Sequence, residues 1–301
     1  MICSRHIINR GDNVSMVQAT DLVHEYIRRD EEGNVESINT ALNKLNINVE
    51  KGEFVAILGH NGSGKSTFAK HINVLLKGSE GTLYVNGYDA ADKKNIWNIR
   101  QSAGIVMQNP DNQIIGTVVE EDVAFGPENI GIPTDEIIRR VEKSLDKVGM
   151  LEHRYESPNK LSGGQKQKVA IAGILALKPK CIVLDEPTAM LDPRGRKDVI
   201  ETVTWLNKEE GITVILVTHN MDEVVAADRV IIMDKGAVVK EGTPREVFED
   251  IDGLTKLKLD VPQVTKIGDN LRKSGIPISK VILTVDELVE EIATIANVIS
   301  K

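Results

Sequence analysis

The sequence predicts an α/β fold built around a parallel sheet, and three observations predict it. Short apolar runs at 54–58, 181–185, 213–217 and 230–233 are typical of buried strands. Segments with helical periodicity separate most of these runs, and this alternation favours a parallel sheet covered by helices on both faces. A glycine-rich loop joins the first run to a helical segment, so that a strand, a tight turn and a helix follow one another directly.

The length and composition indicate a soluble globular protein with one large domain and a small appendage. The chain has 301 residues, of which 41% are hydrophobic, 3% aromatic and 27% charged. It holds no run of the ~18 apolar residues that a membrane span needs and no signal peptide, so we expect a cytosolic protein. The net charge of −8 disfavours nucleic acid as a partner. Cys3 and Cys181 support neither a disulfide framework nor a metal cluster.

The N-terminal part predicts a tail followed by two strands. Residues 1–15 show no periodicity, and we expect a disordered tail with the native start at Met16. Apolar stretches from 17 to 58 flank a polar insert at 28–34, which is typical of a hairpin loop. Tyr26 precedes that insert. Its ring could stack on an adenine face from this outer sheet, or it could be an ordinary half-buried strand tyrosine.

The loop after the strand 54–58 fits the pattern G-x-x-x-x-G-K-S/T. In such a loop the backbone N–H groups hold phosphates, the lysine reaches the β- and γ-oxygens, and the hydroxyl holds Mg²⁺. Lys65 and Ser66 occupy these two positions, and a structural glycine-rich turn is the alternative. The residues of the loop are Gly59, His60, Asn61, Gly62, Ser63, Gly64, Lys65, Ser66 and Thr67.

The middle of the chain predicts an insertion and the start of a new helix. A strand pair near 82–87 leads to an apolar run at 105–107 and then to helical periodicity at 137–148, which looks like an insertion of about 108–160. Residues 161–165 then read Leu-Ser-Gly-Gly-Gln. Ser162 is a candidate N-cap with Gln165 three residues later, so a helix is expected to begin there.

Polar groups follow two of the predicted core strands. Asp185 ends the strand 181–185 and suits the aspartate that orders Mg²⁺ in P-loop NTPases, and Glu186 is a candidate general base for an attacking water. A surface carboxylate pair is the alternative interpretation. His219 follows the strand 213–217, and in isolation it would be interpreted as a satisfied surface histidine.

The last 50 residues predict a small helical tail at 251–301. Pro262 can open a helix that Gly275 and Pro277 end, and a second helix begins at Thr284. That second helix carries an apolar stripe that we expect either to pair with another chain or to fold back on its own domain. The stripe consists of Leu288, Ile292, Ile295 and Ile299.

Six motifs in this order resemble the ATP-binding cassette (ABC) family over about residues 17–250. They are the loop 59–66, Gln108, the signature 161–165, the strand end 181–186, the segment 189–192 and His219. The resemblance implies an α/β P-loop NTPase cassette at 16–250, with a parallel core sheet, an antiparallel β subdomain and a helical insertion at about 108–160. It also implies ATP and Mg²⁺ as cofactors.

The resemblance implies a role for each motif residue. Gly59, Asn61 and the loop 62–67 would hold the phosphates, and Tyr26 would stack on the base. Ser66, Gln108 and Asp185 would hold Mg²⁺, and Glu186, His219 and Gln108 would carry hydrolysis. Ser162, Gly163 and Gly164 would bind the γ-phosphate of a partner cassette, and Gln165 and Asp192 are counted with the nucleotide-binding residues.

The segments 108–113, 122–126 and 162–177 look more specifically like the ATPases of energy-coupling factor (ECF) transporters, and like the first of their two A-type subunits. This implies a peripheral motor at the cytoplasmic face of the cell membrane that imports a vitamin or a transition-metal ion. The implied partners are a second ABC ATPase subunit, paralogous or identical, a transmembrane coupling (T) subunit and a membrane substrate-binding (S) subunit. Family members pair through a tail like 251–301.

The sequence leaves two other functions as alternatives and disfavours a third. A conventional ABC importer ATPase and a soluble ABC ATPase for cofactor assembly would carry the same motifs. A DNA-repair ATPase would carry long coiled coils or two cassettes in one chain, and neither is present here.

Overall fold

The computed structural model describes residues 15–299, with side chains described up to residue 297. Residues 1–14 of the predicted N-terminal tail, with Cys3, lie outside this range. The strands are β1 (Val17–Arg29), β2 (Val35–Val49), β3 (Phe54–Leu58), β4 (Glu80–Val85), β5 (Tyr88–Asp89), β6 (Ala103–Val106), β7 (Cys181–Asp185), β8 (Thr213–Val217), β9 (Arg229–Asp234) and β10 (Ala237–Gly242). The helices are α1 (Lys65–Ile72), α2 (Ile96–Ser102), α3 (Val119–Asn129), α4 (Thr134–Lys147), α5 (Gly163–Leu175), α6 (Pro193–Glu210), α7 (Pro244–Phe248), α8 (Ile251–Lys256), α9 (Gln263–Lys273) and α10 (Val285–Ile299).

The core sheet has six strands in the order β10-β9-β3-β8-β7-β6, and all neighbours are parallel except β9 and β10. Its central strands are the four apolar runs of the sequence, so the predicted parallel sheet is confirmed. Alternate residues of each strand face opposite sides of the sheet, because side chains in a strand alternate with a period of two. On β3, Phe54 and Ala56 therefore join one hydrophobic cluster and Val55 and Ile57 join the other.

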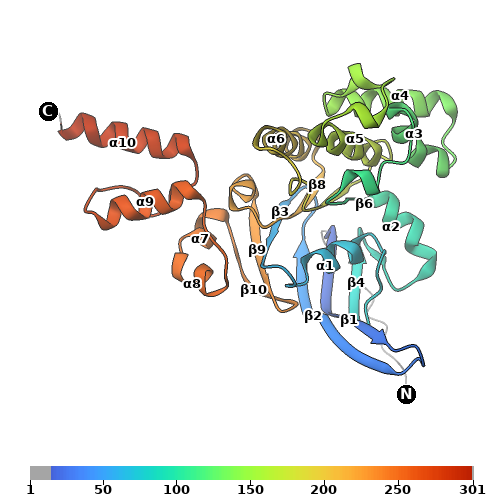
Figure 1. The fold of residues 1–301 in the computed structure, drawn as a ribbon, viewed down its shortest axis with the longest axis horizontal. Coiled ribbons are helices and arrows are strands. Elements are labelled where there is room, and N and C mark those ends of the chain that lie inside the picture. The colour runs from blue at the N-terminus through green and yellow to red at the C-terminus, as the bar shows by residue number, and fades with distance from the viewer. Residues whose placement is uncertain (1–14, 300–301) are drawn as a thin grey trace.

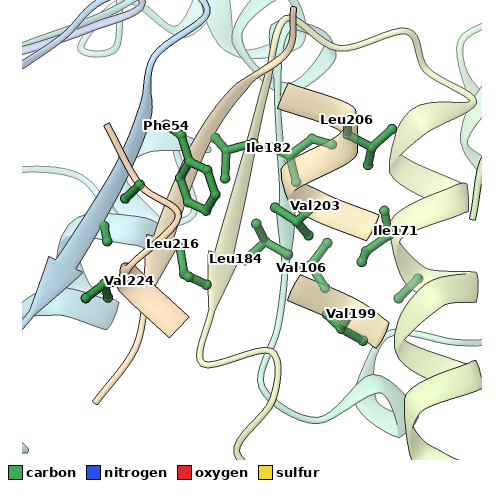
Figure 2. Close-up of a cluster of buried hydrophobic side chains, with 14 of the residues drawn as sticks. Phe54, Val106, Ile171, Ile182, Leu184, Val199, Val203, Leu206, Leu216 and Val224 are labelled. Atoms are coloured by element: carbon green, nitrogen blue, oxygen red, sulfur yellow. The ribbon is translucent and has the colours of Figure 1, made fainter. Parts of the chain in front are cut away.

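The larger cluster lies between the core sheet and the helices α5 and α6. Leu184 and Leu216 of the sheet pack there against Ile171 of α5 and Val203 of α6 (Figure 2). These side chains are buried almost completely, and each contributes roughly 1.5–3 kcal/mol to folding. The packing holds α5 and α6 on this face of the core sheet.

The second cluster lies on the opposite face of the sheet, around α1 and an antiparallel sheet with the order β2-β1-β4-β5. Phe68 and Ile72 of α1 are fully buried in it. The predicted hairpin is present, since β1 pairs with β2 and residues 30–34 form the turn between them. This hairpin extends beyond the rest of the antiparallel sheet (Figure 1).

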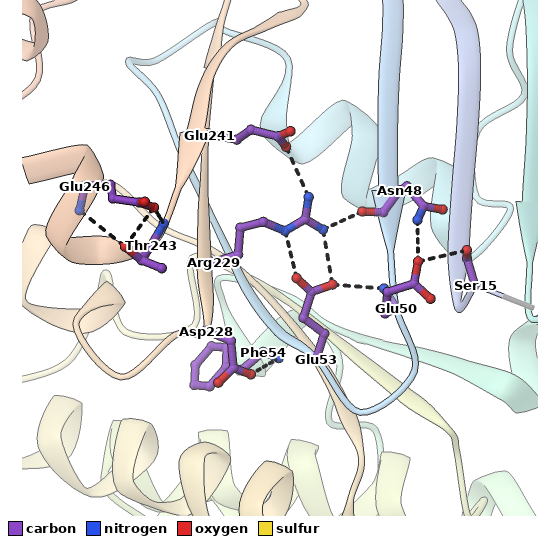
Figure 3. Close-up of polar contacts among 10 residues, drawn as sticks. All are labelled: Ser15, Asn48, Glu50, Glu53, Phe54, Asp228, Arg229, Glu241, Thr243 and Glu246. Atoms are coloured by element: carbon purple, nitrogen blue, oxygen red, sulfur yellow. Dashed lines mark hydrogen bonds and ion pairs between the residues drawn. The ribbon is translucent and has the colours of Figure 1, made fainter. Parts of the chain in front are cut away.

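A network of ion pairs ties the two sheets together. Arg229 of β9 donates from Nε to Glu53 Oε1 at 2.7 Å and from Nη2 to the carbonyl oxygen of Asn48 on β2 (Figure 3). Glu53 Oε2 in turn accepts from the backbone N–H of Glu50 at 2.9 Å. The guanidinium therefore links the end of β2 to the core sheet.

The segment between the core strands β6 and β7 is helical. β6 pairs in parallel with β7 and completes the core sheet, and α3, α4 and α5 pack on one another beyond it. In α4, Ile137, Val141 and Leu145 are buried at the spacing of one helix face. The predicted helix of this segment is present.

The C-terminal helices form a separate small cluster that is anchored to the cassette. Leu259, Val261 and Val281 belong to the large cassette core, whereas Ile282 and Leu288 form the core between α9 and α10. The predicted stripe of α10 does not lie on one exposed face, because Leu288 is buried and Ile295 packs against that small core. The side chain of Ile299 lies outside the described range. The exposed apolar face is instead made of Val285, Val289 and Ile292, which are 61%, 58% and 44% exposed.

Within residues 15–299, no helix has the length and apolar character that crossing a membrane would require.

Candidate nucleotide-binding site

The phosphate loop directly follows β3, and its last three residues, 65–67, open α1. Gly62 and Gly64 have φ of 85° and 102°, in the left-handed region that favours glycine. A Cβ on Gly64 would lie 2.5 Å from the carbonyl oxygen of Ala41, and one on Gly59 would lie 2.4 Å from that of Met233. The loop therefore needs glycine at these positions, and its turn directs backbone N–H groups and the α1 N-terminus toward one point.

Lys65 lies over this loop. Its Nζ donates to the carbonyl oxygens of Gly59 at 2.8 Å and His60 at 3.1 Å. Burial lowers the pKa of Lys65, and the nearby carboxylates of Glu186 and Asp185 oppose that shift. The ammonium is thus held at the mouth of the loop, where anionic phosphate oxygens would favour its charged form.

Ser66 and Asp185 meet at the end of β7. Ser66 Oγ donates to Asp185 Oδ1 at 2.7 Å, and burial raises the pKa of Asp185. A hydroxyl, a carboxylate and phosphate oxygens are the donor set that Mg²⁺ uses in nucleotide sites, where water completes the shell. Residues 15–299 contain no cluster of three or more His, Cys, Asp or Glu side chains suited to a metal. The residues present fit a Mg²⁺ that is bound together with a nucleotide.

Glu186 and His219 are paired at the carboxyl edge of the sheet. His219 Nδ1 lies 3.3 Å from Glu186 Oε2, and the Glu186 side chain is mostly buried while the imidazole is half-exposed. Glu186 has a positive φ of 49°, and its N–H donates to the carbonyl of Val217 on the neighbouring strand β8. The turn at Glu186 is therefore fixed by β8, the strand that leads to His219.

Gln108 lies two residues beyond β6, whose Val106 pairs with Leu184 of β7. This register places Gln108 at the same edge of the sheet as Asp185 and Glu186. The backbone next to it is held by two glutamines that sequence reasoning missed: Gln113 Oε1 accepts from Met107 N–H at 3.0 Å, and Gln167 Nε2 donates to Met107 O at 3.1 Å. The contacts span six and 60 residues, and neither separation follows the repeat of a helix or a strand, so no spacing signal points to them.

Tyr26 lies next to the phosphate loop. Its hydroxyl is 3.4 Å from Thr67 Oγ1, and its ring packs edge-on against His24 with 4.6 Å between centroids. The side chain remains 43% exposed. A flat, half-open aromatic surface therefore stands beside the phosphate-binding residues, on the outer sheet.

The signature residues are placed elsewhere. Ser162 and Gln165 form a complete capping box at the start of α5, and Ser162 Oγ accepts from Gln165 N–H at 3.3 Å. Asp192 caps α6 by accepting from Gly195 N–H at 2.8 Å. The signature and the start of α6 border one hollow of about 480 Å³. Its lining includes Ser162, Gly163, Gly164, Gln165, Lys168, Met190, Asp192 and Arg194. None of the loop residues 59–67 lines this hollow.

The site residues thus form two groups within one chain. The first contains the phosphate loop, Asp185 and Glu186, with His219, Gln108 and Tyr26 at its border. The second contains the signature 162–165 and Asp192. Glu186 and His219 line a separate hollow of about 350 Å³ that the signature residues do not border.

Comparison with known proteins agrees with this arrangement. The ABC transporter family profile matches residues 42–189. The energy-coupling factor transporter ATP-binding protein EcfA1 of Caldanaerobacter subterraneus is 62% identical over 83% of this chain and 90% of its own. The protein of the same name from Clostridium novyi is 54% identical over 92% of this chain and 97% of its own.

Two solved structures are also similar. The cbiO1 protein of Clostridium perfringens, described as part of the ABC transporter complex cbiONQ, is 37% identical with a TM-score of 0.71, over 86% of this chain and 99% of that chain. The ATP-binding cassette MJ0796, a dimer in a post-hydrolysis state bound to ADP and Pi, is 32% identical with a TM-score of 0.67, over 76% of this chain and 99% of that chain.

The fold, the phosphate loop and the signature define the class as an ABC-type ATPase. Within that class, the chain belongs to the family of ATP-binding proteins of energy-coupling factor transporters. The predicted fold and family are therefore confirmed.

Proposed function

We propose that this chain is the motor of an ECF transporter and hydrolyses ATP at sites shared with a second cassette. The observation that carries the proposal is the separation of the two groups of site residues. The signature hollow is lined by the start of a helix and a serine, whose N–H and hydroxyl groups are of the kind that bind phosphate. None of the loop residues 59–67 borders this hollow. A second cassette that faces the first would bring each signature to the other chain's phosphate loop.

The chemistry of such a site rests on positioning and charge. The loop amides and Lys65 would hold the β- and γ-phosphates in line with an attacking water. Glu186 would accept a hydrogen bond from that water, and His219, held 3.3 Å from Glu186, would contact the γ-phosphate. Mg²⁺, bound through Ser66 and Asp185, would supply further positive charge. The signature amides of the partner would stabilise the charge that develops on the γ-phosphoryl group.

An exposed apolar surface near Gln108 supports contact with a transmembrane coupling subunit. Ile115, Phe125 and Tyr155 are largely exposed. Backbone hydrogen bonds from Val119 and Glu120 to the 154–156 segment bring these regions together. Of these residues, Ile115 lies in the loop after Gln108, Phe125 on α3 and Tyr155 in the segment before the signature. Contact of the membrane subunit with this region would let nucleotide binding at Gln108 move that subunit. The proposal also includes a peripheral position at the cytoplasmic face of the membrane, a separate substrate-binding subunit, and import of a vitamin or a transition-metal ion.

Mixed dimers test the shared site. A Glu186→Gln chain lacks the carboxylate for water, and a Gly163→Asp chain places a carboxylate in the signature. If each site is shared, a mixed dimer carries both lesions in one site and leaves the other intact, so ATPase activity appears that neither homodimer shows. If the native partner is a distinct subunit, one lesion is placed in each subunit. A correctly paired, nucleotide-binding mixed dimer without ATPase activity would contradict the proposal.

Co-purification with a hydrophobic membrane protein tests the transport role.

A further inference from the structure

Glu223 is a buried carboxylate that the proposed chemistry does not use. It lies in the short helical turn Met221–Val224 after β8, and its side chain is only 3% exposed. Leaving a carboxylate unpaired at such a depth is costly, so its partners are expected to be specific. Four side chains surround the carboxylate. They come from the segment after Glu186, from the residues on either side of His219, and from α6.

Both carboxylate oxygens accept hydrogen bonds. Oε1 accepts from Thr188 Oγ1 at 2.6 Å and from Asn220 Nδ2 at 3.1 Å, and Oε2 accepts from Thr218 Oγ1 at 2.6 Å. Arg196 Nε of α6 lies 3.6 Å from Oε1. Hydrogen bonds to a charged acceptor are about twice as strong as neutral ones, so this network is a firm link.

The network joins the segments that carry the catalytic pair. Thr188 is two residues after Glu186, and Thr218 directly precedes His219. Both threonines are buried; Thr188 lies in the turn after Glu186, and Thr218 directly follows β8. One carboxylate therefore sets the spacing between the turn of Glu186 and the turn of His219. The same turn continues through Ala189 to the segment 190–192 beside the signature hollow.

We propose that Glu223 is a positioning residue for ATP hydrolysis. By binding Thr188 and Thr218 with its two oxygens, it holds Glu186 and His219 in the arrangement that the reaction needs, without touching the nucleotide. The inference rests on the proposed roles of Glu186 and His219. It predicts a loss of turnover with little change in nucleotide binding.

The test compares variants of the full chain in its active dimer. Glu223→Gln keeps the volume but loses the charge that binds two hydroxyl donors, and we expect kcat to fall roughly tenfold to a hundredfold, the range for a small misplacement of reacting groups. KM and the Kd for ATP should stay within about threefold. Thr188→Val and Thr218→Val should each lower kcat. Combining either with Glu223→Gln should add little, because residues of one network are not additive.

A matched control separates positioning from stability. Glu53→Gln breaks the partly buried pair with Arg229. Neither Glu53 nor Arg229 lines the hollow of Glu186 and His219 or the signature hollow. This variant should lower the melting temperature and leave kcat of the folded protein unchanged. If Glu223→Gln behaves like Glu53→Gln, with reduced stability and kcat within twofold of the parent, the inference is overturned.

Two further arms keep the outcome unambiguous. If Glu223→Gln does not fold, the threonine variants carry the test, because each removes one hydroxyl and keeps the shape. Unchanged kcat in both would overturn the inference. Glu186→Gln is measured in parallel. If this variant turns over ATP like the parent, the proposed chemistry is overturned. If Glu186→Gln is inactive while Glu223→Gln is fully active, only the role of Glu223 is overturned.

Discussion

At the scale of single residues, burial sets the electrostatics of the nucleotide site. Desolvation lowers the pKa of Lys65 and raises that of Asp185, so burial disfavours the charged form of each. Each charge stabilises the other, and Ser66 donates to Asp185 as well. The site can therefore keep both charges in a partly dry pocket, where their effect on phosphates is larger than in water.

Replacing Glu186 by glutamine tests the reaction at one atom. The variant keeps the shape of the side chain and loses the carboxylate, so ATPase turnover should fall by roughly 10² to 10⁴. ATP and Mg²⁺ should still bind, because Lys65, Ser66 and Asp185 are unchanged. Turnover and nucleotide binding by the same preparation check this, and wild-type turnover in a folded Glu186→Gln protein would contradict it.

Replacing Tyr26 tests base stacking. A stacked base is worth about 1–3 kcal/mol, so Tyr26→Leu should weaken ATP binding roughly five- to 150-fold. Tyr26→Phe keeps the ring and serves as the control, since the contact to Thr67 Oγ1 is a long 3.4 Å. Inorganic triphosphate has no base and should bind all three proteins equally. Equal loss for triphosphate and ATP would show that Tyr26 acts on the phosphate loop instead.

At the scale of elements, the prediction from sequence worked where local pattern and tertiary packing agree. The runs at 54–58 and 181–185 are apolar throughout because both faces of a central strand are covered, and the loop 59–67 is fixed by its own glycines. The pattern of α10 was misleading: helical spacing shows that apolar residues share a stripe, but it does not say which side packs on α9. Gln113, Gln167 and Glu223 act through contacts distant in sequence or through burial, which spacing does not reveal.

A carboxylate between helices α4 and α5 predicts a pH effect on stability. Glu136 accepts from Lys178 and from Arg140, both at 2.8 Å, and these hydrogen bonds lower its pKa from 4.5 to about 2. A folded-state pKa below the unfolded value contributes stability above the unfolded pKa, and that stability is lost as pH falls through the folded pKa. The contribution of Glu136 is therefore complete near neutral pH and disappears between pH 4.5 and about 2.

Glu136→Gln should lower the melting temperature near neutral pH, and the difference from the parent should shrink as pH falls below 4.5. Thermal unfolding across this range measures it. Glu128→Gln on α3 is the control, because Glu128 is exposed and has no ion pair among the described residues. A difference that stays constant with pH would show that Glu136 acts through packing and not through its charge.

At the scale of the whole molecule, the proposed function gives a second chain two places to bind, the separated groups of site residues and the exposed face of α10. The signature hollow and the phosphate loop are apart in one chain, and Val285, Val289 and Ile292 are exposed at the spacing of one helix face. The first interaction would depend on nucleotide. The second needs none, so the tail would hold two cassettes together between turnovers.

The tail prediction is best tested by point changes. Deleting 255–301 would also remove Leu259, Val261 and Val281 from the cassette core, so a loss of association could come from unfolding. Changing Val285, Val289 and Ile292 together to serine leaves that core and the α9–α10 core intact. Sedimentation without nucleotide measures the association constant, which should fall at least about tenfold. A tenfold loss corresponds to about 1.4 kcal/mol, and it is expected because three side chains no longer bury apolar surface.

ATP binding to each chain should stay unchanged in the triple variant, because these side chains belong to a helix whose core is separate from the clusters around the phosphate loop. Ile138→Ser, which changes an equally exposed apolar side chain on α4, is the matched control and should associate like the parent. Association of the triple variant at the parental strength, with its fold intact, would exclude this face of α10 from the contact. Pairing would then depend on the nucleotide-bound cassettes alone, and the dimer should come apart after each hydrolysis.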